Sequence, residues 1–481
     1  MSTRAAAALV FATSAAVLVL EILAGRLVAP YVGVSIETFT GVIGTVLAGI
    51  ALGSAAGGRL ADRRDARPLV GPIVALGGGL ALASLPVVTA LGPAVAGGGP
   101  AAIVVLAGAA FFAPAAVLSA VSPMAAKLRL ASLSETGAVV GGLSAAGTAG
   151  ALFGTFVTGF LLVATVPTRP LVLALGTGLV VAGVVLWWRL SRQRPSPAAL
   201  VAFLAVGGVA AAVPGECQEH TSYYCAKIEV DPTRPSGRLL MLDNLRHSYI
   251  DLADPTYLEF RYVRLFADLV EATLGEDQPV DALHIGGGGF SFPRYLAATR
   301  PGSTSLVLEL DPGLVELATE ELGLVRGPDL QVQVGDARTA LAGLGDDRFD
   351  LAVGDAFGGL SVPWHLATVE VAEEIDRVLR PEGVYLANLI DGGPDRLVRS
   401  ETATLQEVFA HVAVVAPPAS AGDSPANYVL VASQAPLPQA VADVPPAEGV
   451  VLTAAALDAF VGDTRPLTDD FAPADQLLTH R

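Results

Sequence analysis

The chain has 481 residues, a mean hydropathy of +0.57 and a formal net charge of −17. These values exclude a single ordinary soluble globule, and the acidic balance excludes nucleic acid as a partner, because phosphate binding needs clustered Lys and Arg. Residues 1–214 carry 12 Lys and Arg against 5 Asp and Glu, whereas the remaining 267 residues carry 17 against 41. We therefore predict a membrane part followed by a water-soluble part.

The first part is a series of long apolar stretches. Each is long enough to cross about 30 Å of hydrocarbon at a rise of about 1.5 Å per residue, and the first is too long for the apolar region of a signal peptide. The sequence predicts an α-helical membrane bundle of about seven spans, the last being the shortest. The stretches are residues 6–29, 38–58, 69–92, 100–122, 137–164, 170–188 and 198–214.

Basic residues indicate how these spans are oriented. Cytoplasmic loops carry an excess of Lys and Arg, and alternate loops here hold almost all of them, the others holding only Arg26 and Arg169. We expect a multi-pass cell-membrane protein, in contact with the lipid bilayer, whose N-terminus is cytoplasmic. The basic residues assigned to the cytoplasmic side are Arg4, Arg59, Arg63, Arg64, Arg67, Lys127, Arg129, Arg189, Arg192 and Arg194.

The seventh stretch determines on which side of the membrane the soluble part is expected. If it crosses, the soluble part is extracytoplasmic, which is the preferred expectation; if it re-enters or lies flat, the soluble part is cytoplasmic. The only two cysteines, Cys217 and Cys225, follow this stretch. Two cysteines in one short exported segment suit a disulfide, and two buried free thiols are the alternative. A metal site is not expected from this spacing with only His220 between them.

One charged residue lies within a span. Glu21 is in the middle of the first stretch, where a carboxylate is costly and normally faces a partner or a wet cavity. Arg26, five residues on, is a candidate partner, and transport or proton chemistry is the alternative. Small residues spaced four apart, such as Gly49 and Gly53, allow helix backbones to approach closely and predict tight packing of the bundle.

The loop Gly58-Arg59-Leu60-Ala61-Asp62-Arg63-Arg64 resembles the cytoplasmic loop motif of major facilitator transporters. The resemblance covers this loop alone and agrees with the expected orientation. A complete alternating-access transporter would need a second half from another copy, which makes a homodimer a candidate assembly.

The second part is predicted to form one α/β domain with three segments. These are a β-rich N-terminal part with a small hairpin (215–275), a Rossmann-like domain of the methyltransferase type (276–440) and a C-terminal tail (441–481). From about residue 279 strands alternate with helices, as in a parallel doubly wound sheet. The expected strands are 224–230, 238–242, 281–285, 305–310, 330–334, 349–353, 383–388, 412–415 and 428–432, with helices after Gly289, from Pro312 and over 366–380.

Glycines and acids gather where these strands end, which is where open α/β sheets bind ligands. Gly286-Gly287-Gly288 follows the first strand of the sheet and allows a ligand to approach the backbone. Glu309 ends the next strand, where it suits ribose hydroxyls, and Asp336-Ala337 is placed to contact an adenine edge. A tight turn explains each feature alone. Together they predict a nucleoside site, and the absence of a G-x-G-x-x-G pattern favours an S-adenosylmethionine-type co-substrate over NAD.

Residues 219–433 resemble a spermidine synthase, which is a polyamine aminopropyltransferase. The whole chain resembles fusions of such a domain with a multi-span segment, the fused major-facilitator and spermidine synthase type. The resemblance implies transfer of an aminopropyl group from decarboxylated S-adenosylmethionine to a diamine, without a metal. It is carried by Glu219 to Val230, Leu242-Asp243-Asn244, Tyr257-Leu258-Glu259, Ile285-Gly286-Gly287-Gly288, Glu309-Leu310-Asp311, Gly335-Asp336-Ala337 and Asp355.

The resemblance also implies roles for single residues. Asp355 matches the catalytic carboxylate, which must take or hold the proton of the amine nucleophile. Both reactants are cationic, so carboxylates are expected to line the cleft. The implied donor contacts are His247, Gly286, Gly287, Gly288, Glu309 (ribose), Asp336 (adenine) and Ala337, and the implied amine contacts are Tyr257 and Glu259.

The chain departs from the family pattern at two carboxylates. Gly289 stands where the glycine loop of the family has an Asp that holds the ammonium of the donor, and Gly358 stands where the catalytic motif has its second Asp. The segment Leu467-Thr468-Asp469-Asp470-Phe471-Ala472-Pro473 is a candidate for returning carboxylates to the cleft, and a capping or turn role is the alternative.

Three functions are therefore compared. The preferred one is a membrane-bound aminopropyltransferase that acts on a polyamine or another small amine. Methyl transfer from S-adenosylmethionine is the first alternative, because an Asp at position 289 would repel the carboxylate of that co-substrate. The second is a sensor or transporter subunit that binds a nucleoside or polyamine without catalysis. Activated methionine donors are cytoplasmic, so an exported domain implies a ligand that is found or delivered outside.

Overall fold

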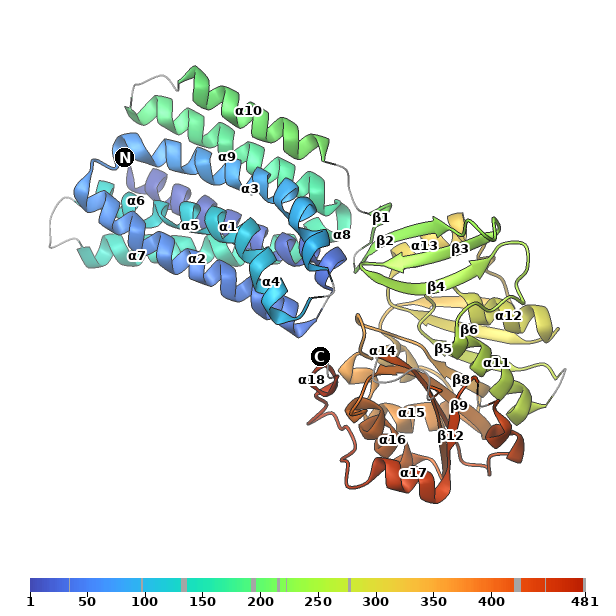
Figure 1. The fold of residues 1–481 in the computed structure, drawn as a ribbon. Coiled ribbons are helices and arrows are strands. Elements are labelled where there is room, and N and C mark those ends of the chain that lie inside the picture. Colours follow the sequence, from blue (N-terminus) through green and yellow to red (C-terminus); the bar gives the residue numbers. More distant parts are fainter. Residues whose placement is uncertain are drawn as a thin grey trace. The chain divides into compact units, whose positions relative to one another are not determined.

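The computed structural model describes residues 1–33, 35–96, 98–130, 136–191, 196–213, 217–221, 223–275, 278–418, 425–445 and 447–478. The chain divides into two compact units, Met1–Cys225 and Ala226–Arg481 (Figure 1). The first unit is a bundle of helices, and the second is built around a large β-sheet with helices on both faces.

Six helical runs of the described first unit are long and apolar enough to cross a membrane. Two of them contain a five-residue π-helical segment. The runs are α1 (Thr3–Val32), α2 (Ile36–Arg63), α3 (Arg67–Val95), Pro100–Arg129 (α4 Pro100–Ala107, η1 Gly108–Phe112, α5 Ala113–Ser119, α6 Val121–Arg129), Thr136–Leu162 (α7 Thr136–Val157, η3 Thr158–Leu162, followed by α8 Val163–Thr165) and α9 (Thr168–Ser191).

The expected seventh span is shorter than predicted. Residues Pro197–Ala212 form α10, an apolar helix of 16 residues, which is about 24 Å long at about 1.5 Å per residue. It ends before Val213, which precedes a proline in the sequence, and the residue before a proline disfavours the helical conformation. The expected count of about seven spans is therefore corrected to six runs of spanning length and one shorter helix.

Glycines lie where the helix backbones are closest. A Cβ atom at Gly53 of α2 would overlap the backbone of Ala116 in α5, and one at Gly154 of α7 would overlap the backbone of Ala15 in α1. Because only a hydrogen fits at such contacts, the small-residue spacing sets how closely the helices approach. The predicted packing role of these glycines is confirmed.

Polar contacts join helix termini at each end of the bundle. At the end that holds the N-terminus, Lys127 pairs with Asp62 at 2.9 Å. At the other end, the Arg169 guanidinium at the start of α9 donates to the carbonyls of Ala210 and Ala211 at 3.2 and 2.8 Å. Helix α10 therefore runs antiparallel to α9 and returns to the level at which α9 begins (Figure 1).

The segment after α10 is tied to this second end of the bundle. Arg26 donates from its guanidinium to the carbonyl of Thr221, next to β1 (Glu219–His220). A disulfide joins Cys217 to Cys225, so the predicted pairing is confirmed and the free-thiol alternative is excluded. Five residues turn a helix by about 500°, which places Glu21 and Arg26 on different faces of α1, so helix geometry does not favour the pairing that was considered for Glu21.

The second unit begins with a small antiparallel sheet. Strands β2 (Cys225–Val230), β3 (Gly237–Leu242) and β4 (Leu245–Asp251) pair in this order. The sequence predicted the first two within one residue, but it did not predict β4, which carries His247. The turn between β3 and β4 places Asp243 at a φ of 53°, a left-handed conformation that Asp tolerates in tight turns.

An eight-stranded sheet follows, in the order β12-β10-β11-β9-β8-β5-β6-β7. Strands β5 to β9 are parallel, whereas β11, β10 and β12 continue the sheet in antiparallel pairing. The predicted doubly wound sheet is confirmed. Its strands are β5 (Asp281–Ile285), β6 (Thr304–Glu309), β7 (Leu330–Val334), β8 (Phe349–Gly354), β9 (Leu379–Asp391), β10 (His411–Ala416), β11 (Ala426–Ser433) and β12 (Val450–Leu452).

Both faces of this sheet are covered by helices. Successive strand residues point to opposite faces, so Leu283 packs under α14, α15 and α16, whereas Ala282 packs under α11 and α12. The helices α11, α14, α16, α17 and α18 were not predicted. The bounds are α11 (Arg261–Leu274), α12 (Ser291–Thr299), α13 (Pro312–Glu321), α14 (Ala337–Leu341), η4 (Trp364–Leu366), α15 (Val369–Val378), α16 (Arg396–Val408), η6 (Gln439–Asp443), α17 (Ala454–Val461) and α18 (Ala474–Leu477).

Candidate active site

The candidate site lies at the carboxyl ends of β5 and β8, the two central parallel strands. Strand β5 pairs with β6 on one side and with β8 on the other. The strands that follow β5 in the sequence are therefore added first on one side (β6, β7) and then on the other (β8, β9), so the order of strands reverses at β5. Open α/β sheets bind ligands at such a reversal. The amide of Asp355 donates to the carbonyl of Ile285 at 2.9 Å, which joins the two strand ends.

The glycine loop after β5 is held by Glu309. One carboxylate oxygen accepts hydrogen bonds from the amides of Gly287 and Gly288, at 2.8 and 3.2 Å, and the other accepts from the amide of Asp311 at 2.8 Å. Burial raises the pKa of Glu309, and these three amides oppose that rise. The predicted ribose contact has not been tested; the structure adds that the same carboxylate fixes the loop.

The loop backbone requires glycine at two positions. Gly286 has a φ of 96° and Gly288 a φ of 50°, conformations that side chains other than glycine rarely adopt. A Cβ at Gly286 would also lie 2.9 Å from the carbonyl carbon of Asp355, and one at Gly288 would lie 3.2 Å from His247 Cδ2. His247 therefore flanks the loop, and the donor contact implied for it stays a prediction. Burial lowers the pKa of His247 to about 4, so its imidazole is neutral near pH 7.

The next strand end places Asp336 at the start of α14. One carboxylate oxygen caps the helix by accepting from the amide of Thr339 at 3.0 Å, and the other pairs with His365 Nε2 at 2.9 Å. Burial raises its pKa, but these contacts outweigh burial and lower the pKa overall. Ala337 is buried in the first turn of the helix. The adenine contact that was predicted for this pair remains a prediction.

Asp355 follows β8 and is held by two donors from other elements. Tyr262 at the start of α11 donates its hydroxyl at 3.1 Å, and Asn388 of β9 donates its amide at 2.9 Å. Asn427 of β11 in turn donates to the Asn388 side-chain oxygen at 2.9 Å. Burial raises the pKa of Asp355 to about 6, and the two hydrogen bonds limit the rise. Asp355 was predicted from the sequence, whereas its three supporting residues were not.

The predicted amine contacts lie together in a different network. Tyr257 donates to the Glu259 carboxylate at 2.6 Å, and the Arg234 guanidinium stacks on the Tyr257 ring at 3.7 Å. Tyr249, whose hydroxyl donates to Asp231 at 2.8 Å, contacts the same ring. Among the described residues, no hydrogen bond joins Tyr257 or Glu259 to Asp355. The next residues of the chain lead into α11 and hence to Tyr262.

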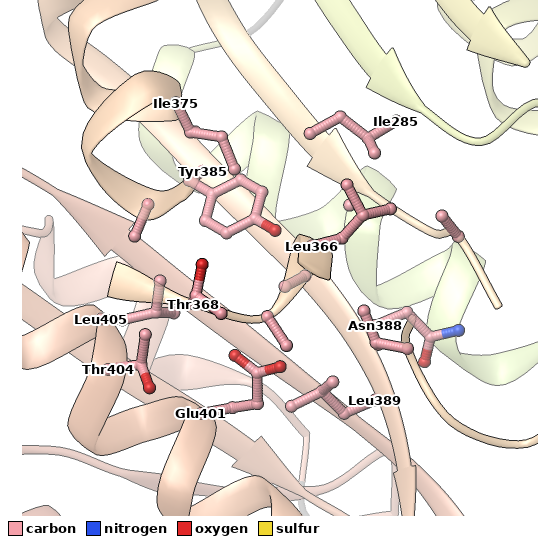
Figure 2. Close-up of a pocket in the computed structure, with 16 residues that line it drawn as sticks. Ile285, Leu366, Thr368, Ile375, Tyr385, Asn388, Leu389, Glu401, Thr404 and Leu405 are labelled. Atoms are coloured by element: carbon pink, nitrogen blue, oxygen red, sulfur yellow. The ribbon is translucent and has the colours of Figure 1, made fainter. Parts of the chain in front are cut away.

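A small cavity of about 30 Å³ lies behind Asn388 (Figure 2). Glu401 of α16 points its carboxyl group into this cavity, near Thr368, Thr404 and Tyr385. Burial raises the pKa of Glu401 to about 8. Glu401 was not predicted, because no helix was expected between β9 and β10 and a Glu within a helix is ordinarily solvated.

The segment Leu467–Pro473 does not supply a free carboxylate to the cleft through Asp469. The Asp469 carboxylate forms an ion pair with Arg338, whose Nη1 lies 2.6 Å from Asp469 Oδ1. It also accepts a hydrogen bond from Thr368 Oγ1 at 2.9 Å. The amide of Val369 donates to the carbonyl of Leu467 at 2.9 Å. The segment therefore fixes the C-terminal end of the loop that begins at Asp355. Among the described residues, no group of three or more His, Cys, Asp or Glu side chains is placed to hold a metal ion.

Comparison with known proteins agrees with this geometry. Residues 283–387 match the sequence family described as a methyltransferase domain. The polyamine aminopropyltransferase of Vibrio vulnificus (strain CMCP6) is 30% identical over 237 residues, which cover 45% of this chain and 75% of that protein. The human eEF1A lysine and N-terminal methyltransferase is 32% identical over 124 residues, which cover 23% of this chain and 18% of that protein.

A solved structure agrees with both the fold and the sequence likeness. The probable spermidine synthase from Corynebacterium glutamicum ATCC 13032 is 27% identical with a TM-score of 0.50, and the match covers 56% of this chain and 100% of that chain. The sheet, the glycine loop and the acids at the strand ends define a Rossmann-like transferase of the class that binds S-adenosylmethionine-type co-substrates. Within that class, the chain belongs to the polyamine aminopropyltransferase family.

The protonation of Glu401 predicts a dependence of stability on pH. The ordinary pKa of 4.5 applies to the unfolded chain, and the folded value is about 8. Between these values the folded protein holds a proton that the unfolded chain has released, so stability falls as the pH rises from 5 to 8. Glu401→Gln keeps the neutral form at every pH. We expect it to melt near the wild-type temperature at pH 5 and several degrees above it at pH 8, since 1 kcal/mol corresponds to about 2–4 °C.

Differential scanning calorimetry of the full chain in detergent measures this difference. Glu407→Gln is the matched control, because Glu407 lies on the same helix and is exposed to solvent. An equal shift of the Glu401→Gln melting temperature at both pH values would contradict the assignment.

Proposed function

We propose that the chain is a membrane-bound aminopropyltransferase that moves an aminopropyl group from decarboxylated S-adenosylmethionine to a diamine or a related amine. The observation that carries the proposal is the position of Asp355. Its carboxylate lies at the reversal of strand order, beside the glycine loop, and is oriented by Tyr262 and Asn388. Family membership supports the same chemistry.

The residues at the strand ends suit the nucleoside part of the donor. The glycine loop has two backbone conformations that exclude side chains, so a ligand can approach its amides, and Glu309 at the end of β6 has further lone pairs for ribose hydroxyls. When bound, the donor supplies a carbon activated by a positively charged sulfur, and breaking that bond leaves methylthioadenosine. Glu309 and His247 would bind and orient the donor.

Asp355 would manage the proton of the acceptor. An amine attacks only through its neutral form, so the proton that it loses must pass to a nearby base. Burial raises the pKa of Asp355 to about 6, which makes it a better proton acceptor near neutral pH than an exposed Asp. Glu401 lies behind Asn388 in the same region. A cationic amine at this cavity would favour its ionised form, so Glu401 is a candidate to replace one missing family carboxylate.

We expect Asp355→Asn to lower aminopropyl transfer by at least about 100-fold, because a positioned base contributes typically 10²- to 10⁴-fold. The substitution keeps the size of the side chain, so methylthioadenosine should bind within about threefold of the wild-type affinity, since no charge-assisted contact to the nucleoside is removed. Wild-type transfer should rise with pH through a midpoint near 6 and level off above it, once the carboxylate form is fully populated.

Steady-state transfer from the decarboxylated donor to putrescine and isothermal titration with methylthioadenosine measure the two quantities. Asp458→Asn, on α17 and exposed to solvent, is the matched control for loss of a carboxylate elsewhere. Turnover of Asp355→Asn at a rate comparable with the wild type would remove the catalytic role and favour a binding-only protein.

A second candidate function is methyl transfer from S-adenosylmethionine, and it is favoured by the lack of room for a side chain at Gly289. A Cβ atom at this position would overlap Ile250 Cδ1 and lie 2.8 Å from Ser248 Cβ. Both residues are buried, so the family Asp that holds the donor ammonium would require them to move. Position 358 is different, because a Cβ there would meet only Pro363 Cγ, at 3.8 Å.

This difference predicts opposite results for restoring the two family carboxylates. Gly358→Asp should fold normally and lower the KM for putrescine about tenfold, because a charge-assisted contact is worth about 1.5–3 kcal/mol. Gly358→Asn should leave the KM unchanged. Gly289→Asp should weaken binding of both donors, since its side chain displaces Ile250 and Ser248.

Steady-state kinetics with putrescine and titration with the ordinary and decarboxylated donors provide the comparison. A preference of the wild type for ordinary S-adenosylmethionine, with no response of Gly358→Asp to putrescine, would place methyl transfer ahead of aminopropyl transfer.

We also propose that the helical bundle spans the cell membrane with its N-terminus in the cytoplasm, and that α10 crosses as a short seventh helix. Two contacts support this placement. Arg169 joins the end of α10 to the start of α9, and Arg26 binds Thr221 in the following segment. Both arginines lie near the helix ends that the charge pattern assigns to the outside. The Cys217–Cys225 disulfide also suits an oxidising compartment.

The placement predicts that the α/β unit is exposed outside the cytoplasm. Val325, which is 81% exposed, can be changed to Cys as a probe, because both native cysteines are in the disulfide. We expect Val325→Cys to react with a membrane-impermeant maleimide on intact cells. Asp65→Cys, in the loop between α2 and α3, should react only after permeabilisation. The reverse pattern at Val325 would place the catalytic unit in the cytoplasm and would mean that α10 does not cross.

A further inference from the structure

Helices α1 and α7 share a close, parallel seam. A Cβ at Gly150 would overlap the carbonyl of Phe11, and one at Gly154 would overlap the carbonyl of Ala15. Each step of four residues along α7 therefore matches a step of four along α1, in the same direction. The next step brings Thr158, the first residue of the π segment η3, to the level of residue 19.

Glu21 lies on the same seam at nearly the same level. Ser14 faces Gly147 of α7, where its hydroxyl would be 3.3 Å from a Cβ. Seven residues turn a helix by about 700°, which is within about 20° of two full turns, so Glu21 projects from the same face of α1 as Ser14. Two residues separate Glu21 from the level of Thr158, which is about 3 Å along the helix axis.

Both side chains carry a buried polar atom without a partner. The Oε2 atom of Glu21 is shielded from solvent and accepts no hydrogen bond in the described structure, and the same is true of the Thr158 hydroxyl, whose residue is 0% exposed. Buried polar groups are ordinarily paired, so an unpaired one needs an explanation. Two of them at one level of one seam, beside a π segment of the kind that often occurs at functional sites, point to a bound species.

The surroundings contain no fixed countercharge. The helix α7 and the segment η3 have no charged residue. The charged residues of the other described helices that pack on α1 lie in their terminal turns, and the Arg26 side chain points from another face. These terminal residues are Glu37, Arg59, Asp62 and Arg63 of α2, Arg67 of α3, Lys127 and Arg129 of α6, and Arg169 and Arg189 of α9.

We propose that Glu21 and Thr158 form a proton-binding site inside the bundle, which rests on the proposed membrane location. The Glu21 carboxylate takes up one proton to form the neutral acid, and the Thr158 hydroxyl accepts a hydrogen bond from that acid. No redox change or further reactant is involved. The proton neutralises a carboxylate that the hydrocarbon would otherwise strongly disfavour, so its gain and loss couple the α1–α7 seam to the pH of the solution.

Dicyclohexylcarbodiimide tests this proposal, because it is apolar and reacts with protonated carboxyl groups. The full chain in detergent micelles is treated between pH 6 and pH 9, and the modified peptides are quantified by mass spectrometry. We expect Glu21 to be modified at pH 6 and at least tenfold more slowly at pH 9. Sodium ions at constant pH should not protect it. Glu37, which is exposed at the start of α2, is the control for a solvated carboxylate.

Thr158→Val removes the hydroxyl and keeps the shape of the side chain. Because the neutral acid loses its hydrogen-bond acceptor, modification of Glu21 at pH 7 should slow at least threefold, whereas Thr158→Ser should behave like the wild type. Modification that does not depend on pH, protection by sodium ions, or no modification of the folded protein would each overturn the proposal. Resistance of the protein to carbonate extraction from membranes is measured in parallel, so that a failed proton site is distinguished from a wrong membrane location.

Discussion

The contact on which the site depends is the hydrogen-bonded pairing between the Glu309 carboxylate and the amides of the glycine loop. A loop with left-handed glycines has no side chains with which to fix itself, so its shape must be fixed by a neighbour. Glu309 does this from the end of β6 while its own position is set by the parallel pairing of β6 with β5. The pairing of β5 with β6 thereby determines where the backbone amides of the glycine loop lie.

A similar arrangement holds the Asp355 carboxylate. Asp355 is joined to the end of β5 through its own amide and to α11 and β9 through its side chain. Asn427 extends the contact to β11, where the sheet has become antiparallel. Neither asparagine titrates, and burial raises the pKa of Tyr262 well above its usual value. Among the groups in contact with Asp355, the carboxylate itself is therefore the one that can exchange a proton near neutral pH.

The sequence was sufficient for the features that depend on local pattern. Strand patterns that alternate with helix patterns marked β5 to β8, and the acids at strand ends marked Glu309, Asp336 and Asp355. It was insufficient where a role depends on contacts between distant segments. Tyr262, Asn388 and Glu401 come from three elements that meet only after folding, and nothing in the local sequence of any of them distinguishes it from an ordinary residue of its helix or strand. The seventh helix was predicted as the shortest, and it ends at Ala212, two residues earlier than predicted.

The contacts of the segment around Asp469 form late in the synthesis of the chain. Leu467 and Asp469 bind Val369, Arg338 and Thr368, and so fix the loop that follows Asp355. Chains are made and fold from the N-terminus, so these residues leave the ribosome after the whole helical bundle and every strand of the large sheet. The loop next to the Asp355 carboxylate is therefore secured as one of the last events of synthesis. The helical part is therefore synthesised before the contacts that fix the loop after Asp355 can form.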